Sequence, residues 1–440
     1  MSENNKSQEN QKRQFDEDQN KKLLRCSEKK DMTEWNEWRK DNKEISVLLE
    51  RANLMGAHLE GANLMGAHLE GAYLIEAHLE RTNLIGAHLE RANLVGAHLE
   101  GANLGEAHLE RAYLGEAHLE GANLMGAHLE GAYLIEAHLE RTNLIGAHLE
   151  RAYLGEAHLE GAILMGAHLE GAILAKAHLE RANLGEAHLE GANLIGADLE
   201  CASLAKAHLE GANLNDANLE GASLAEAHLE GAELRETNLE GADCSSAILD
   251  GKTLIWNCNI NEETDFTGTG LDSARVEPRL KVKLQGNIRR KQWEEWYEEG
   301  SKLKQQYKKL IVKPFWWVSD YGRSTGRIVG CFFGLSIMFA FFYYLFGLID
   351  GQGIIANLFV DYNAQTSNLI PINPYIVPVR AIYFSIVTMT TLGFGDMYAQ
   401  PGSYLGHILL MIQVLLGYIL LGALVTRFAI LFTSSGPEKG

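Results

Sequence analysis

The sequence of 440 residues lacks the residue patterns that mark several common protein classes. Its five cysteines are scattered, odd in number and without CxxC spacing, which argues against a disulfide framework or a zinc site and favours a reducing compartment. There is no nucleophile–base arrangement, phosphate-binding loop or HExxH motif, so we expect neither enzyme activity nor a cofactor. The N-terminal stretch is polar, so we expect no secretory signal and a cytoplasmic N-terminal part.

Positive charge is scarce in the middle of the chain. Residues 47–251 contain 33 Asp and Glu but only 10 Lys and Arg, a net charge of −23, whereas the whole chain carries −19. The chain is therefore an acidic block with mildly basic ends. Such a block favours a basic protein partner on the acidic surface, and we expect no binding of nucleic acid.

The acidic block is rich in leucine at every fifth position. The series runs from Leu49 to Leu249 with a break only at Cys244. A small residue, nearly always Ala, lies two positions before each leucine. A period of five fits neither a helix nor a strand. It fits a chain that turns a corner every five residues, with Leu and the small residue inside. Four such sides make a square coil, and coils stack through sheet-like hydrogen bonds.

Segments such as Ala62-Asn63-Leu64-Met65-Gly66 resemble the pentapeptide-repeat proteins, whose motif is A-(N/D)-L-x-x. The resemblance covers 41 consecutive pentapeptides over residues 47–251 and implies a right-handed four-sided β-helix. Residues 61–92 recur unchanged at 121–152, an offset of 60 residues or three coils. This copy indicates tolerance of length changes and argues against a ligand site confined to one coil.

Sixteen of the 17 histidines lie in this block, at ten-residue steps from His58 to His188 and then at His208 and His228. Twenty residues per coil place them in two columns on opposite faces, next to columns of glutamate such as Glu60 and Glu70. Two interpretations stay open. The columns are either a pH or metal sensor, or a solvated surface copied by duplication, which is the simpler interpretation.

The C-terminal part has a different pattern. Trp293, Trp296 and further aromatic residues at helical spacing, among dense Lys and Arg, predict an amphipathic helix, and Trp316 and Trp317 predict a membrane interface. Two apolar runs, 328–349 and about 404–425, are long enough to span a bilayer, the second with a polar Gln413. Basic residues are dense before the first run, so we expect both termini in the cytoplasm. Two spans joined to such a repeat block look bacterial, so we expect a bacterial plasma membrane.

The segment between these runs is too short for a third span and ends in Thr388-Met389-Thr390-Thr391-Leu392-Gly393-Phe394-Gly395-Asp396. It resembles the potassium-channel signature T-x-x-T-x-G-(Y/F)-G-D, within a resemblance that covers about residues 327–432. Pro378 suits the first turn of a short pore helix, whose C-terminal end favours a cation. In that family rings of backbone carbonyl groups replace the water around K⁺, the permeant ion, and glycine permits the necessary backbone conformation.

The resemblance implies a role for each matching residue. The ion-coordinating residues of the filter are Thr391, Leu392, Gly393 and Phe394. Filter support comes from Gly395, Asp396, Thr388, Tyr383 and Phe384. The gating-hinge candidates are Gly417 and Gly422. Because one subunit supplies one filter loop and a ring needs four, the resemblance implies a homotetramer in membrane lipid.

Two filter residues depart from the commoner pattern. Leu392 replaces the usual Val or Ile, and Phe394 replaces Tyr and so lacks a hydroxyl to bond to the pore helix. One alternative to a potassium channel is therefore a weakly selective cation channel, and another is an acidic interaction scaffold anchored in the membrane. No voltage-sensing helix with spaced arginines is apparent.

These observations predict a multidomain protein: a pentapeptide-repeat β-helix plus an α-helical transmembrane pore domain with two spans and a re-entrant pore helix. The expected segments are a disordered polar tail (1–30), an N-terminal cap (31–46), the β-helix (47–273), interfacial linker helices (274–326), the pore domain (327–433, with spans 327–349 and 404–428 and the pore helix and filter at 378–396) and a C-terminal tail (434–440).

Overall fold

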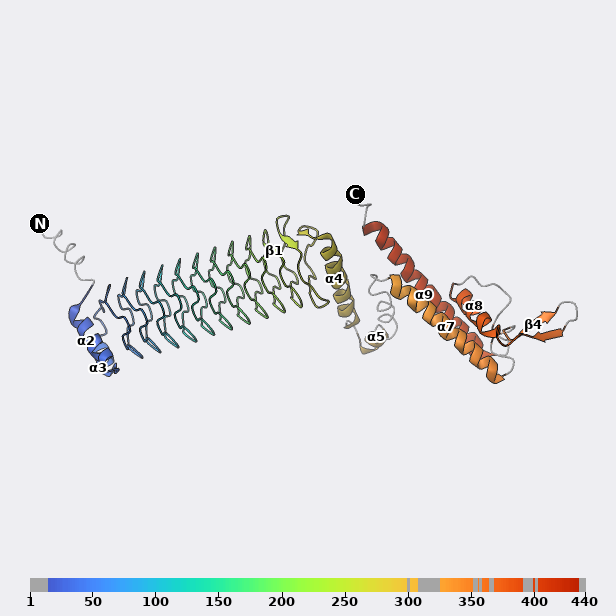
Figure 1. The fold of residues 1–440 in the computed structure, drawn as a ribbon, viewed down its shortest axis with the longest axis horizontal. Coiled ribbons are helices and arrows are strands. Elements are labelled where there is room, and N and C mark those ends of the chain that lie inside the picture. The colour runs from blue at the N-terminus through green and yellow to red at the C-terminus, as the bar shows by residue number, and fades with distance from the viewer. Residues whose placement is uncertain are drawn as a thin grey trace. The chain divides into compact units, whose positions relative to one another are not determined.

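The computed structural model describes residues 15–298, 301–307, 325–350, 355, 358–363, 368–390, 399 and 403–434. It separates into two compact units, Met1–Lys291 and Gln292–Gly440. In the first unit the described chain passes from two short helices into a long stack of coils and ends in a third helix (Figure 1).

Backbone bridges join each coil of the first unit to the next at a spacing of 20 residues, as in the parallel pairs His58↔His78 and Asn63↔Asn83. On one side of a coil, the N–H of His78 donates to the Ala57 carbonyl at 2.9 Å, and the N–H of Leu59 donates to the His78 carbonyl at 2.7 Å. Four five-residue sides per coil confirm the predicted four-sided β-helix.

The interior of the coils is built from the two positions that the five-residue pattern assigns to it. Leu69 and Ala67 are both fully buried, as are nearly all their counterparts along the stack. Cys244, which interrupts the leucine series, occupies the same buried position. Burial raises the pKa of the Cys244 thiol far above its usual value, so this cysteine is an inert core residue.

The corners of the coils are tight turns with one residue in the left-handed region. The N–H of Ala62 donates to the Leu59 carbonyl at 3.0 Å, and Gly61 between them has a φ of +65°. Arg81 at an equivalent corner has a φ of +54°. A residue with a Cβ costs about 1 kcal/mol or more in this region, which accounts for the frequent glycine there.

The first coil is covered by two helices, α2 (Glu17–Glu28) and α3 (Thr33–Asp41). Trp35 is fully buried, and its indole N–H donates to the Asn63 carbonyl at 3.0 Å. Trp38 packs beside it, with 5.1 Å between the ring centroids. These tryptophans therefore lie over the open end of the stack, where the sequence analysis put the cap.

The prediction of a disordered tail over residues 1–30 is wrong for helix α2, while residues 1–14 lie outside the described residues. Asp16 caps this helix by accepting the backbone N–H groups of Asp18 and Gln19, both at 3.0 Å. Leu23 and Cys26 are buried against the coil. Three apolar residues, Leu23, Leu24 and Cys26, are too weak a compositional signal in a polar stretch to reveal a docked helix.

The other end of the stack contains a short parallel sheet in the order β1-β2-β3. Its strands are β1 (Glu233–Arg235), β2 (Leu254–Trp256) and β3 (Arg275–Val276). Glu233 pairs with Leu254 at a spacing of 21 residues rather than 20, which produces the break in phase. Beyond this break Phe266 is buried and returns to the core.

Helix α4 (Pro278–Glu298) packs on this end of the coils. It buries Leu280 and Leu284 in the core, and the side-chain amide of Asn287 donates to the carbonyls of Asn261 and Thr264 at 2.7 and 3.1 Å. These three residues of α4 therefore close this end of the stack. Trp316 and Trp317 lie outside the described residues.

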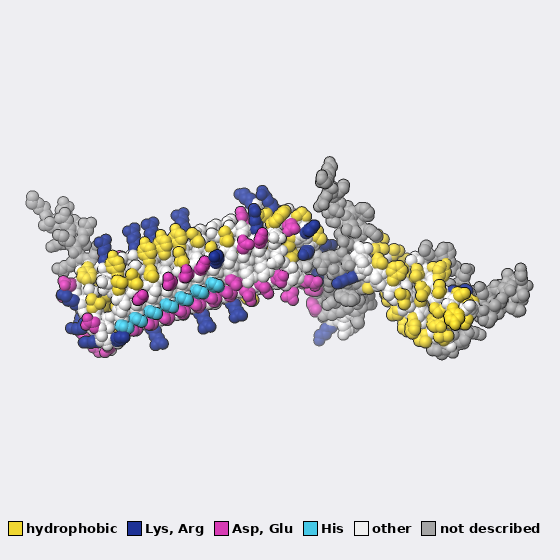
Figure 2. Space-filling model, in the orientation of Figure 1, with side chains coloured by type: hydrophobic (Ala, Val, Ile, Leu, Met, Phe, Trp, Pro, Cys, Tyr) yellow, Lys and Arg dark blue, Asp and Glu magenta, His cyan; other side chains and the backbone are white. Residues whose placement is uncertain are grey.

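The second unit contains two long apolar helices and a shorter one between them in sequence. Its described elements are α5 (Lys302–Tyr307), α7 (Thr325–Asp350), β4 (Val360–Asn363), β5 (Asn368–Pro371), α8 (Val377–Met389) and α9 (Tyr404–Ser434). Strands β4 and β5 form an antiparallel hairpin that the sequence analysis did not predict. The 22-residue stretches Thr325–Phe346 and Tyr404–Val425 are long and apolar enough to cross a membrane. Apolar side chains cover much of the visible surface of this unit (Figure 2).

Candidate functional site

Helix α8, the candidate pore helix, packs against both long helices of the second unit. Pro378 lies in its first turn, where a missing N–H breaks no helical hydrogen bond. Val377, Ala381 and Phe384 form one apolar face, which is buried in a cluster with Tyr343 and other α7 residues. The Phe384 and Tyr343 rings meet in an edge-to-face arrangement at a centroid distance of 5.5 Å.

A buried hydrogen-bond network joins the three helices. The Tyr343 hydroxyl donates to the side-chain oxygen of Gln413 at 2.5 Å, and the Gln413 amide donates to the carbonyl and hydroxyl of Ser385 at 2.9 and 2.6 Å. The Ser385 hydroxyl in turn donates to the Ser336 carbonyl at 2.7 Å. Polar groups at membrane depth need such partners. The side chain of Gln413 therefore links α9 to α7 and α8 through hydrogen bonds.

Gly417 marks a close approach between α9 and the C-terminal end of α8. A Cβ added at Gly417 would overlap the carbonyl oxygen of Met389 and lie 2.9 Å from its carbonyl carbon. A Cβ at Gly422 would meet no described atom within 4 Å. The two glycines, grouped in the sequence analysis as hinge candidates, thus differ: Gly417 is required by packing, and the hinge role of either stays a prediction.

The predicted filter-support residues occupy different environments in α8. Thr388 in the last turn is 8% exposed, Phe384 is buried, and Tyr383 is 53% exposed. The hydroxyl of Thr390 donates to the carbonyls of Ile386 and Val387 at 3.1 and 3.0 Å, which closes the helix end. The other filter positions, Thr391, Leu392, Gly393, Phe394, Gly395 and Asp396, lie outside the described residues.

An apolar cavity of about 240 Å³ lies beside the end of α8. Met389 and Thr390 line one part of it, and the rest is lined by side chains of α7 and α9, among them Phe332, Leu420 and Leu424. Neither this cavity nor the partners of Gln413 were predicted from the sequence. The one signal in the sequence was the glutamine itself, a polar residue in an apolar run.

Two family models match the chain in separate regions. Pentapeptide repeats match in 8 copies between residues 52 and 254, which is the stack of coils. The ion-channel family matches residues 372–434, which contain α8 and α9. The chain therefore belongs to the pentapeptide-repeat proteins and carries an ion-channel domain on its C-terminal side. Both families are non-enzymatic.

The similar solved structures are pentapeptide-repeat proteins. HetL, involved in heterocyst differentiation regulation in the cyanobacterium Nostoc sp. strain PCC 7120, is 34% identical over 46% of this chain and 86% of its own, with a TM-score of 0.33. QnrB1, a plasmid-mediated fluoroquinolone resistance protein, is 15% identical over 51% and 96%, with a TM-score of 0.23. Rfr23 from the cyanobacterium Cyanothece 51142 is 29% identical over 30% and 64%, with a TM-score of 0.14. No curated protein matches the chain.

Proposed function

We propose that the chain is one subunit of a homotetrameric, potassium-selective channel that conducts K⁺ passively. The observation that carries this proposal is the placement of the signature residues after α8. The helix ends with Thr388 buried, and Thr391-Leu392-Gly393-Phe394-Gly395 follows within a few residues. The partly negative C-terminal end of such a helix stabilises a cation, and the carbonyl groups of Thr391 to Phe394 would then supply the ion sites.

The outward face of α8 supports assembly with further subunits. Val379 and Tyr383 are largely exposed although they lie on a helix that packs between the two apolar helices. A large exposed apolar surface next to a filter loop suits burial against a neighbouring copy of the pore domain. Tyr383 would then support the filter from that interface, while Phe384 supports it from within its own subunit.

The proposal also assigns a side of the membrane to each part. The basic residues before α7 favour the cytoplasmic side. The stack of coils, called the repeat rod from here on, and the C-terminal tail would therefore both be cytoplasmic. The rod, at −23 over residues 47–251, would offer a surface for regulation or for a basic protein partner.

The test is a bi-ionic reversal potential on the purified protein in planar bilayers, with K⁺ on one side and Na⁺ on the other. We expect reversal close to the potassium equilibrium potential. Gly393→Ala should abolish this selectivity because the filter backbone needs a conformation that glycine tolerates. Gly334→Ala in α7 is the matched control, since a Cβ there meets no described atom within 4 Å.

Each outcome separates the alternatives. A reversal near zero with measurable current overturns potassium selectivity and establishes the weakly selective cation channel. Absence of current in the wild type, combined with salt-sensitive capture of a basic protein by the full chain, favours the membrane-anchored scaffold.

A further inference from the structure

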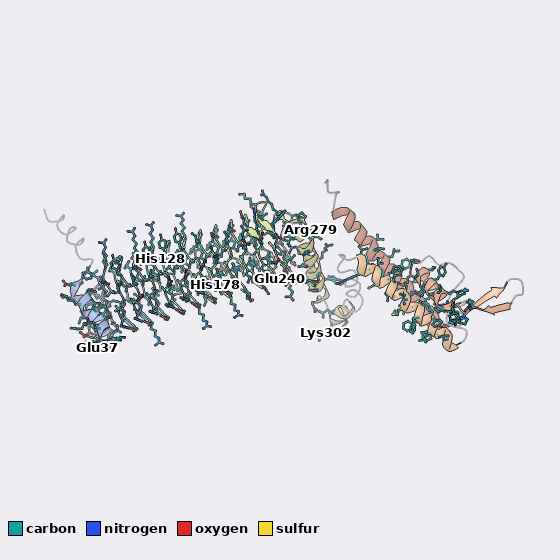
Figure 3. All side chains as sticks on the ribbon, viewed as in Figure 1. Glu37, His128, His178, Glu240, Arg279 and Lys302 are labelled. Carbon is teal, nitrogen blue, oxygen red and sulfur yellow. The ribbon has the colours of Figure 1, made fainter. Side chains whose placement is uncertain are left out.

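The sixteen rod histidines form two regular columns outside the pore domain. Column A consists of His58, His78, His98, His118, His138, His158 and His178. Column B consists of His68, His88, His108, His128, His148, His168, His188, His208 and His228. Within each column the rings stack, with centroid distances between 4.5 and 5.0 Å. Figure 2 shows a file of histidines running along the rod next to acidic side chains, and Figure 3 labels one member of each column, His128 and His178.

Every histidine of both columns has a glutamate partner two residues further on. The Nδ1 atom of His68 lies 3.0 Å from a carboxylate oxygen of Glu70, and that of His118 lies 3.4 Å from Glu120. The histidine side chains are about one-third exposed, as at His128 with 35%, so an ion in solution can reach them.

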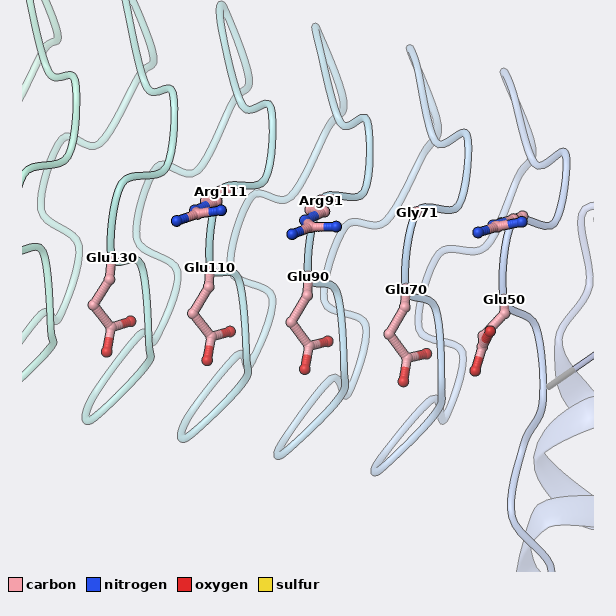
Figure 4. A pocket seen from close by; sticks show the side chains of 9 residues that line it. Glu50, Glu70, Gly71, Glu90, Arg91, Glu110, Arg111 and Glu130 are labelled. Atoms are coloured by element: carbon pink, nitrogen blue, oxygen red, sulfur yellow. The ribbon is translucent and has the colours of Figure 1, made fainter. Parts of the chain in front are cut away.

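Except at Glu60, the second oxygen of these carboxylates is buried and has no partner among the described residues. This holds for the Oε2 atoms at ten-residue steps from Glu70 to Glu190, and again at Glu210 and Glu230. Figure 4 shows the carboxylates of Glu70, Glu90 and Glu110 in a file along one face of the coils. A file of like charges with unsatisfied oxygens attracts a cation.

The two columns also bring complete sets of metal-binding atoms together. Ligand atoms of His118, Glu120 and His138 lie within 4.8 Å of one another, as do those of His188, Glu190 and His208. Two imidazoles and a carboxylate are a ligand set typical of Zn²⁺ and related divalent ions. We propose that the columns bind divalent transition-metal ions of this class, each held by two successive histidines and the glutamate between them.

The geometry of the columns sets the number of ions. Stacked rings at the coil spacing must tilt toward one another to share an ion, and these side chains, which are about one-third exposed, can do so by χ rotation without moving the coil. A neutral imidazole has one free nitrogen lone pair, so each histidine serves one ion. The seven histidines of column A then hold three ions and the nine of column B hold four, about seven per chain.

The coils do not need histidine at these positions. Asp198 follows His178 in the register of column A, and Asn218 follows Asp198; the Asn218 amide donates to the Asp198 carboxylate at 3.0 Å. The backbone ladder continues through both residues with the same 2.9 Å hydrogen bonds. A role for the histidines in holding the fold is therefore weaker than a role in binding, and asparagine is a substitution that the coil accepts.

The test is a calorimetric titration of the untagged, full-length protein in detergent with Zn²⁺ after removal of bound metal. We expect about seven ions per chain for the wild type and about three for a variant with all nine column B histidines replaced by asparagine. A variant with Asn63, Asn83, Asn103, Asn123 and Asn143 replaced by serine is the matched control and should keep the wild-type number. Ser203 and Ser223 already occupy that register, and circular dichroism establishes that each variant retains its coils.

Two further readouts identify the ligands. Co²⁺ bound by imidazole and carboxylate in a tetrahedral site absorbs visible light much more strongly than Co²⁺ in water. This absorption per chain should be weaker in the asparagine variant, in which only column A can bind. Binding should weaken as the pH is lowered, because protons compete with the metal ion for its ligands. The proposal is overturned if the wild type binds fewer than one ion per chain, or if the asparagine variant binds as many ions as the wild type. These readouts do not depend on conduction, so they are independent of the proposed channel function.

Discussion

The repeat rod and the pore domain are specified by their sequences in different ways. In the rod one five-residue rule is applied again and again, so that Leu69, Leu89 and their counterparts share the same buried environment. In the second unit the decisive contacts are each made once per chain, such as those of Gln413 and Gly417. A substitution in the rod therefore alters one of many equivalent contacts. A substitution in the pore domain removes a contact that is made only once per chain.

The strongest test of this redundancy is a deletion in phase with the coils. Removing residues 81–140 takes out 60 residues, or three coils, and joins Glu80 to Arg141. Since residues 61–92 and 121–152 are identical, the new junction has the native sequence. We expect the shortened protein to keep the circular dichroism of the coils and to conduct like the wild type.

A deletion of 58 residues, 81–138, is the matched control, because it removes almost the same length but shifts the register of the coils. It joins Glu80 to Leu139 and moves every later leucine by two positions relative to the first coils. The cap and the first coils can then no longer stack on the rest, and we expect aggregation or loss of the cooperative unfolding transition. If both deletions behave alike, the register of the coils is not what holds the rod together.

The second largest effect should come from Gly417→Ala in the pore domain. The new Cβ overlaps the carbonyl of Met389, so α9 and the end of α8 must separate at a cost of about 1–3 kcal/mol. Because this displacement lies at the helix end that leads into the proposed filter, we expect at least a roughly tenfold loss of current, which corresponds to 1.4 kcal/mol.

Gly422→Ala, measured in the same bilayer assay, is the control for the close approach. A Cβ at Gly422 meets no described atom within 4 Å, so its effect should be small if packing is the reason for glycine. A larger loss of current from Gly422→Ala than from Gly417→Ala would contradict this explanation and favour Gly422 as the gating hinge.

Sequence reasoning succeeded where a pattern repeats. The leucine period identified the buried positions and the twenty-residue coil. The two apolar runs likewise predicted the helices now seen as α7 and α9. In each case many residues follow the same pattern, so that a single exception such as Cys244 does not hide the pattern.

Reasoning from the sequence failed where a contact is made once between distant segments. Nothing periodic links Tyr343, Ser385 and Gln413, which come from three helices and meet only when these pack. Helix α2 was missed because only Leu23 and Cys26 of its apolar residues are fully buried in a polar stretch. Single contacts of this kind have no periodic signature, and the packed structure is needed to find them.

Gln413→Leu should have an intermediate effect because it breaks one of these single contacts. The Tyr343 hydroxyl loses its acceptor, and the Ser385 carbonyl loses its donor from Gln413. An unsatisfied buried polar group costs about 1–3 kcal/mol, which should lower the thermal unfolding temperature of the detergent-solubilised protein. Tyr343→Phe should cost less, because it leaves only the Gln413 oxygen unpaired.

The double variant, Gln413→Leu with Tyr343→Phe, checks the network directly. Residues in one hydrogen-bond network are coupled, so the double variant should lose less stability than the sum of the two single variants. Strictly additive losses would show that the Tyr343–Gln413 hydrogen bond does not contribute as a pair.

The smallest effect should come from Thr82→Val, which tests the equivalence of the coils. The buried Thr82 hydroxyl donates to the Leu59 carbonyl of the preceding coil at 3.0 Å. Valine keeps the shape and removes this bond, and the Leu59 carbonyl still accepts the N–H of Ala62. We therefore expect a loss of about 1 kcal/mol or less, measured as a shift of the urea midpoint followed by circular dichroism.

Thr142→Val is the matched substitution in the identical copy of this segment. Its hydroxyl donates to the Leu139 carbonyl of its own turn at 2.7 Å, rather than to the coil before. If the coils are equivalent parts, the two hydroxyls have the same choice of acceptors, and both variants should shift the midpoint equally. A reproducible difference between the two midpoint shifts would show that position along the rod matters, and it would contradict the equivalence of the coils on which the comparison with the pore domain rests.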